Sequence, residues 1–400
     1  MPTYMYVARS REGKVQKGTL SAENKAALVR VLQGRGLTLE RAQERSGSVR
    51  KHGPKIKTHE VMVFTRQLST VVDAGLPLLQ GLDILAEQAE DPRFGQIIQE
   101  IALDIEGGES FSEALRKHPR CFTDLYISIV ASGEAGGNLS EVLLQLAEYM
   151  EAMEDLKRRI RSAMTYPVVA FSMIILIAAG LIIWVVPQFE EIFSSFDKAL
   201  PVPTQILIDV SKVLRSVYAL GVVAVVVMAV IAVRLYAQTP AGRYQLDAIK
   251  LRLPVFGKLL RKVAISRFSR TLSTLMRSGV AILGALEIAE RTAGNEVFAK
   301  TIREAGDCVR RGETLAEPLA RSGEYPAMVT RMIGIGEKAG AIDKMLTKIS
   351  DFYDAEVKAA VDGLTSLIEP ILIMMMGIVV GGIVIALFMP ILQLSSLVQQ

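Results

Sequence analysis

Two short segments carry glycine spacings of the kind that hold phosphate groups, so they are the first places to look for chemistry. Gly13-Lys-Val-Gln-Lys-Gly18-Thr19 lacks the Lys-Ser/Thr pair that would contact terminal phosphates and Mg²⁺, and it opens a predicted strand instead of a helix. Gly334-Ile-Gly336-Glu-Lys-Ala339 has a dinucleotide-binding spacing, but it follows a predicted helix where a strand is required. Neither segment predicts a nucleotide site.

The residues that usually bind metals or carry out nucleophilic catalysis are sparse. The three histidines, His52, His59 and His118, have no metal-ligand spacing, and no Cys/His or Ser/His/Asp arrangement stands out. Cys121 and Cys308 are not part of a C-x-x-C pair, and we expect both to stay reduced in the cytoplasm. The sequence therefore predicts no catalytic residue, metal site or cofactor. If the protein does mechanical work, a partner must supply the energy.

An internal duplication is the strongest pattern in the chain. The segment FTRQLSTVVDAG from Phe64 recurs as FSRTLSTLMRSG from Phe268, and the motifs that follow keep one offset until a single residue is lost. Prolines that bracket an apolar run also recur, as Pro167 and Pro187 in the first copy and as Pro370 and Pro390 in the second. A duplication that stays in register predicts two copies of one folded unit, each ending in a membrane span.

Each copy also contains a Gly-Glu-x-x-Gly turn between two predicted helices. Its residues are Gly133, Glu134 and Gly137 in the first copy and Gly336, Glu337 and Gly340 in the second. Glycine permits a left-handed backbone or a close approach of two helices. We expect the glutamate near the N-terminus of the following helix, where the helix dipole favours its charge by ~0.3–1 kcal/mol. Two roles remain open for these residues, a structural turn or a contact with a partner.

Half of the residues are hydrophobic and 22% are charged. This composition is more apolar than that of a typical soluble protein of this length. The apolar residues are concentrated in three uncharged runs, which predict transmembrane helices at 168–187, 216–233 and 370–390. Lysines and arginines cluster before the first run and after the second. This asymmetry predicts a membrane protein with a cytoplasmic N-terminus, a short connector on the outer side at 188–215 and a tail on the outer side at 391–400.

Two features of the third predicted span are candidates for contacts. Gly377, Gly381 and Gly382 form a G-x-x-x-G stretch that permits close helix approach, either within one protomer or between protomers. Glu369 lies at the cytoplasmic edge of this span, where we expect its carboxylate to be hydrated or paired.

The remaining chain predicts a mainly α membrane protein with a small α+β N-terminal module. The module covers residues 1–45, with two or three strands and a helix over Ala22–Gln33, and a linker follows at 46–57. Residues 58–165 and 262–368 predict two homologous cytoplasmic helical bundles, and the last helix of the first bundle, from about Ser140, continues toward the membrane. The net charge of +4 is small, and its basic clusters follow the membrane topology, so we expect no nucleic acid partner.

These features together resemble the PilC/GspF family of inner-membrane platform proteins, which serve type IV pilus assembly and type II secretion. The resemblance is carried by the N-terminal module, FTRQLSTVVDAGLPL from Phe64, the repeated turn and the three spans. The stretches 252–261 and 351–370 favour the pilus branch. Ala281 departs from the family pattern, because many relatives keep a proline in both copies and only Pro77 is present here.

The resemblance implies a non-enzymatic platform that couples a cytoplasmic ATPase to the insertion or extraction of pilin subunits. The implied partners are the assembly and retraction ATPases, pilins, other inner-membrane pilus assembly proteins, further copies of the chain and the lipid bilayer. A type II secretion platform is the main alternative. A small membrane transporter is a more distant one, because it would need more spans and often inverted repeats.

Overall fold

The computed structural model describes residues 3–10, 15–21, 29, 37–45, 56–194, 201–254 and 256–398. Near the N-terminus, strands β1 (Thr3–Ser10), β2 (Val15–Ser21) and β3 (Leu37–Arg45) form an antiparallel sheet in the order β2-β1-β3. Apart from residue 29, the helix expected over 22–33 lies outside the described residues, as does most of the linker. The rest of the described chain is helical, which confirms the predicted fold class of a mainly α protein.

The first repeat consists of six helices whose ends follow local sequence signals. They are α2 (Thr58–Asp73), α3 (Leu78–Gln88), α4 (Pro92–Glu106), α5 (Phe111–Arg116), α6 (Asp124–Gly136) and α7 (Leu139–Gly180). Asp91, Ser110 and Thr123 cap α4, α5 and α6, each accepting a hydrogen bond from a backbone amide of the first turn. These short caps and turns fold the chain back on itself, so the helices form a compact bundle.

The second repeat has the same order of helices. They are α12 (Phe256–Arg277), α13 (Ile282–Thr292), α14 (Glu296–Arg310), α15 (Ala316–Arg321), α16 (Ala327–Ala339) and α17 (Ile342–Val398). Its first helix begins before residue 262, the expected start of the bundle. Neither α7 nor α17 is interrupted at the expected bundle ends, residues 165 and 368, because no helix-stopping turn follows there.

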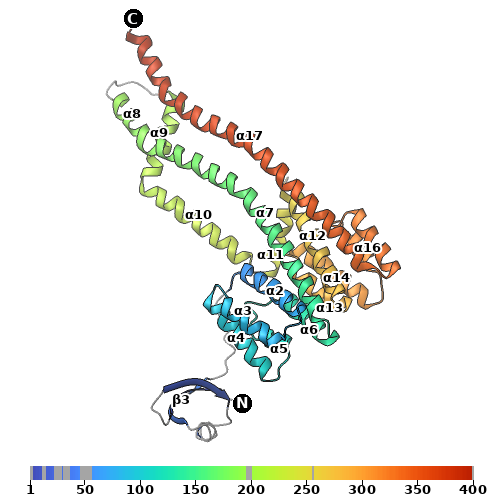
Figure 1. The fold of residues 1–400 in the computed structure, drawn as a ribbon. Helices are drawn as coiled ribbons and strands as arrows, with labels where there is room; N and C mark the ends of the chain where they lie inside the picture. The colour runs from blue at the N-terminus through green and yellow to red at the C-terminus, as the bar shows by residue number, and fades with distance from the viewer. Residues whose placement is uncertain are drawn as a thin grey trace.

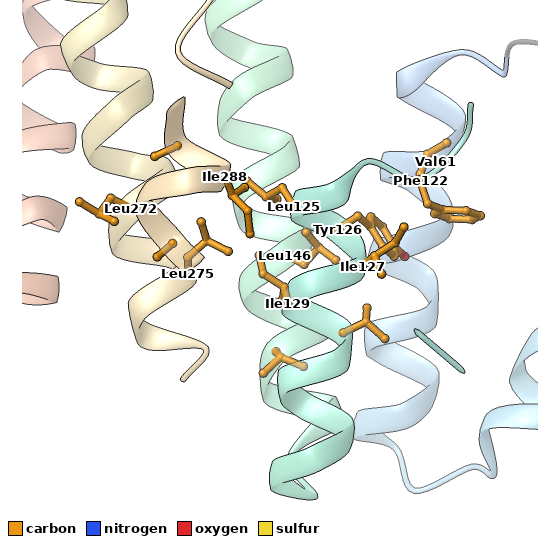
Figure 2. Close-up of a cluster of buried hydrophobic side chains, with 14 of the residues drawn as sticks. Val61, Phe122, Leu125, Tyr126, Ile127, Ile129, Leu146, Leu272, Leu275 and Ile288 are labelled. Carbon is orange, nitrogen blue, oxygen red and sulfur yellow. The ribbon is translucent and has the colours of Figure 1, made fainter. Parts of the chain in front are cut away.

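One buried core joins the two repeats. Figure 2 shows its central part, where Leu125, Ile129 and Leu146 of the first repeat lie close to Leu272, Leu275 and Ile288 of the second. Polar groups also cross this contact. The Ser132 hydroxyl donates to the Ser278 carbonyl oxygen at 2.6 Å, and the Ser278 hydroxyl donates to Oε1 of Gln145 at 2.9 Å. Since apolar packing and satisfied hydrogen bonds both hold the contact, the two bundles form one unit.

Three long helical segments extend from the same side of the two bundles (Figure 1). The first is α7, which continues through a π-helical turn, η1 (Leu181–Val185), into α8 (Val186–Ser194). The return consists of α9 (Val202–Arg215) and α10 (Val217–Tyr236), followed by α11 (Pro240–Arg252). The third segment is α17.

Two helical segments of the described chain, Leu139–Phe189 and Ile342–Met389, are long and apolar enough to cross a membrane. The middle candidate is α10, whose 20 residues cover nearly all of the span expected at 216–233. Its second part, Ala224–Tyr236, also forms a bent pair with Pro240–Arg252, at an angle of 109°. Two spans are therefore clear from length and composition, and the third depends on how this pair is counted.

The connector expected at 188–215 is largely helical and packs against the membrane helices. The Thr204 hydroxyl in α9 donates to the Ala386 carbonyl oxygen at 2.5 Å, and the Ser211 hydroxyl donates to the Ile182 carbonyl oxygen at 2.7 Å. Ile182 belongs to the π-helical turn, whose altered spacing can leave a carbonyl oxygen free to accept such a bond. Part of the expected connector thus lies beside the segments of α17 and of η1, which follows α7, that are farthest from the bundles.

Candidate functional site

The glycines of the repeated turn have two different structural tasks. Gly137 and Gly340 end α6 and α16 in the left-handed conformation, with φ of 69° and 62°. Gly133 and Gly336 instead face the next helix. A Cβ atom at Gly133 would lie 2.1 Å from Cγ2 of Val142, and one at Gly336 would lie 2.9 Å from Cγ of Met345. Only glycine allows this approach, so these residues set how the membrane-directed helices leave the bundles.

The glutamates of the turn do not lie where the sequence suggested. Glu134 is in the last turn of α6, not at the start of the following helix, and its carboxylate reaches back to the preceding short helix, α5. Oε1 accepts from the Phe111 amide at 2.5 Å, and Oε2 accepts from the Ser112 amide at 2.9 Å. Amides in the first turn of a helix lack an internal partner, and the helix dipole favours an anion there. Glu134 therefore acts as a remote cap.

Glu337 occupies the same place in the second repeat. Its Oε1 accepts from the Leu315 amide at 2.6 Å, just before α15, while Oε2 is buried without a hydrogen-bond partner among the described residues. Both carboxylates are therefore directed into their own bundles. This geometry supports the structural role for the repeated turn and does not present either charge to a partner.

An ion pair that sequence reasoning missed is also repeated. Nε and Nη2 of Arg66 donate to Oε1 and Oε2 of Glu151 at 2.6 and 2.5 Å. At the equivalent positions, Nη2 of Arg270 donates to Oδ2 of Asp354 at 2.5 Å, and it also contacts Asp351 at 3.0 Å. Each pair ties the first helix of a repeat to its membrane-directed helix. The signal was available, because both copies carry an arginine and an acidic residue at matched positions.

Electrostatics in the first of these pairs follows from its geometry. The hydrogen bonds from Arg66, helped by its positive charge, lower the pKa of Glu151, although partial burial acts in the opposite direction. The same contact raises the pKa of Arg66. Both groups are therefore ionised near neutral pH, and the pair links α2 to α7 as a two-point hydrogen-bonded contact.

The glycines of the third predicted span make no close contact with other described residues. A Cβ atom at Gly377, Gly381 or Gly382 would have no described atom within 4 Å. The three glycines therefore make no close contact with another helix of the described chain, although Val379 between them packs against a buried cluster that includes Ile208. Contact of these glycines with a second copy stays a proposal. Glu369 is exposed and makes no ion pair with a described residue.

The prolines expected to mark the span boundaries lie inside helical segments. Pro167 is within α7, Pro187 is in the first turn of α8, and Pro370 and Pro390 are within α17. A proline removes one backbone hydrogen bond, and a helix can continue through it where its neighbours accommodate the loss. The matched prolines therefore do not end the helices, and their place at the span boundaries stays a prediction.

The described residues contain no group of three or more His, Cys, Asp or Glu side chains that could hold a metal ion. Gly334–Ala339 lies within α16, so its glycines form no phosphate-binding loop. A groove of about 270 Å³ between α13 and α14 contains two arginines, but both are paired: Arg303 with Glu290 at 2.6 Å and Arg310 with Glu287 at 3.4 Å. The groove thus offers no free charge for an anionic substrate.

Comparison with known proteins accounts for this arrangement of two bundles and two long apolar helices. The family model for protein F of the type II secretion system matches residues 64–187 and again 268–390, and the model of its N-terminal domain matches residues 1–40. The chain belongs to the type II secretion system protein F family. In protein F the repeated unit includes the apolar half of the last helix, because both matches extend through the region of the spans.

Individual relatives of this protein F family cover almost the whole chain. The type IV pilus assembly protein PilC of Thermus thermophilus is 41% identical over 98% of each chain. PilC of Myxococcus xanthus is 40% identical over 99% of this chain and 96% of its own. The type II secretion system protein F of Xanthomonas campestris is 33% identical over 99% of both. The chain is thus similar to members of both branches, with higher identity to these two pilus proteins.

Proposed function

We propose that this protein is the inner-membrane platform of a type IV pilus assembly machine. The observation that carries the proposal is the near-complete alignment with two PilC proteins at 40% and 41% identity, against 33% for a type II secretion protein F. On this proposal the platform couples a cytoplasmic assembly or retraction ATPase to the insertion or extraction of pilin subunits. It is not itself an enzyme.

The continuous helices give this role a physical basis. A force applied to either bundle reaches the membrane without passing through a flexible loop, because α7 and α17 begin at the Gly-Glu-x-x-Gly turns and run on into the apolar region. The paired Arg66 and Arg270 hold the first helix of each bundle to these two helices. The proposed topology has three spans, with the N-terminus and bundles in the cytoplasm and the α8–α9 connector at the periplasmic side.

Deleting the gene in its own host distinguishes a role in pilus assembly from a role in type II secretion. We expect the deletion strain to lose surface pili, seen by electron microscopy, and to secrete folded exoproteins normally; expression of the full chain restores the pili. Loss of exoprotein secretion with normal pili would overturn the proposal in favour of a type II secretion platform. The purified protein should hydrolyse no ATP alone, and it should co-purify with the pilus ATPase.

A further inference from the structure

The chain turns sharply between α10 and α11, and local contacts fix the turn. The Thr239 hydroxyl accepts from the Gly242 amide at 3.1 Å, and the Tyr236 hydroxyl donates to Oε1 of Gln245 at 2.7 Å. A Cβ atom at Gly242 would lie 2.0 Å from the Tyr236 carbonyl oxygen, so only glycine fits the turn. The helices meet at 109°. If α10 crosses the membrane, as the proposed function requires, α11 lies nearly parallel to the membrane surface.

One face of α11 is docked on the second repeat. The buried Asp247 carboxylate accepts from the Glu296 amide at the start of α14 at 2.9 Å, and Leu251 is buried close to Gly257. The outward face and the α11–α12 junction carry apolar side chains that the described chain covers only in part. Ile249, Leu253 and Phe256 are 57%, 47% and 42% exposed.

Exposed cations occur on the same helices as these apolar residues and on α7 and α10. Many lysines and arginines have a carboxylate partner, for example Lys250 of α11 with Asp247 at 2.8 Å and Lys262 of α12 with Glu356 at 2.7 Å. Another group is exposed without an acidic partner in the described part of the chain: Arg159 and Arg161 of α7, Arg234 of α10, Arg243 and Arg252 of α11, and Lys258 of α12. The surface is therefore both apolar and positively charged.

The packing of α12 places this surface at the level of the membrane boundary. Leu259, three residues after Phe256, belongs to a buried cluster with Leu156 of α7 and Leu364 of α17. Leu156 immediately precedes the basic residues after which α7 becomes uncharged, and Leu364 lies shortly before Glu369, the last charge of α17. The α11–α12 junction thus lies beside the points where both other helices change from charged to apolar.

We propose that this surface, formed by Arg243, Ile249, Arg252, Leu253, Phe256 and Lys258 and here called the interfacial patch, binds the anionic phospholipids of the cytoplasmic leaflet. The apolar side chains enter the boundary between headgroups and acyl chains, while the guanidinium and ammonium groups bind lipid phosphates. Because Asp247 and Leu251 fix α11 to the second repeat, the patch holds that bundle at a set orientation to the bilayer. The inference rests on the proposed topology of α10.

The charge contribution is tested by measuring which lipids the full-length protein retains. The protein is purified in micelles containing phosphatidylglycerol and phosphatidylcholine, and bound lipid is measured by native mass spectrometry. We expect the variant Arg243→Gln/Arg252→Gln/Lys258→Gln to lose the preference for phosphatidylglycerol severalfold. The matched control, Arg277→Gln/Arg331→Gln/Lys338→Gln, removes the same charge from exposed positions in α12 and α16 of the second bundle and should behave like the unmutated protein. Equal retention by both variants would overturn the proposal.

The depth of the patch gives a second readout. An environment-sensitive fluorophore is attached at Leu253→Cys or Val227→Cys in a chain with Cys121 and Cys308 replaced by serine, and the protein is reconstituted in vesicles containing phosphatidylglycerol. We expect headgroup nitroxides to quench the label at 253 and aqueous iodide to leave it bright. A water-exposed label at 253 with a lipid-buried label at 227 overturns the patch alone. A water-exposed label at 227 removes the middle span and, with it, the proposed topology.

Discussion

The carboxylate of Glu134 bonds to two backbone amides at the start of α5, and this geometry determines how its substitution acts. Replacing it with alanine leaves both amides without a charged acceptor, and hydrogen bonds to charged groups contribute about 1.5–3 kcal/mol. We therefore expect Glu134→Ala to lower the melting temperature of the purified full-length protein in detergent, and Glu134→Lys to lower it further by placing a cation at the helix N-terminus.

A suitable control is Glu113→Ala, because Glu113 is exposed and its one ion pair among the described residues is with Arg116, one turn away in the same helix. That variant should melt like the unmutated protein. If Glu134→Ala melts normally but weakens co-purification of the ATPase, the glutamate is a partner contact and the capping role is wrong.

The Arg66–Glu151 pair makes stability depend on pH in a defined direction. The hydrogen bonds from Arg66 lower the pKa of Glu151 in the folded protein below its unfolded value. Their stabilising effect is therefore present above the unfolded pKa and is lost as pH falls through the lower, folded value. We expect Arg66→Gln to lower the melting temperature at neutral pH and to reduce its fall on acidification. Parallel melting curves of the two proteins across this pH range would contradict the assignment.

Among the elements, α17 carries open glycines where a substitution can test association without disturbing folding. Since a Cβ atom at Gly381 meets nothing in the described chain, Gly381→Leu should insert normally and keep its melting temperature. If the face packs against a second copy, the added side chain blocks the approach of the two helices, and crosslinking between protomers and piliation should fall. Gly363→Leu is the matched control, because its site on the same helix is also open. Unchanged crosslinking and normal pili in Gly381→Leu would mean that the glycines face lipid.

Local sequence patterns predicted the helices and turns better than they predicted the contacts between them. The duplication from Phe64 and Phe268 predicted two like bundles, and the turn glycines predicted left-handed helix ends, since both depend on nearby residues. The fold-back of α5 onto Glu134 and the packing of α9 against Ile182 were not predictable in this way. Both join segments whose spacing carries no periodic signal, so only the tertiary structure brings them together.

At the scale of the whole molecule, the topology can be tested by labelling single cysteines in intact cells. In a chain with Cys121 and Cys308 replaced by serine, a cysteine at Ser194 in α8 should react with a membrane-impermeant maleimide, and cysteines at the exposed Glu109 and Glu313 should react only after lysis. Ser266 is unsuitable as a cytoplasmic site because it is fully buried. Labelling of Glu109→Cys in intact cells with protection of Ser194→Cys would reverse the orientation.

The length of α17 has a mechanical consequence. An unbroken helix of 57 residues is about 85 Å long at 1.5 Å per residue, and its first turns are buried against α16 in the second bundle. If that bundle tilts by about 10°, the far end of α17 moves by ~15 Å. This distance is somewhat larger than the diameter of a helix with its side chains. A push that moves the bundle by a few ångströms therefore acts on the short arm of a lever, and the far end of α17 makes the larger movement.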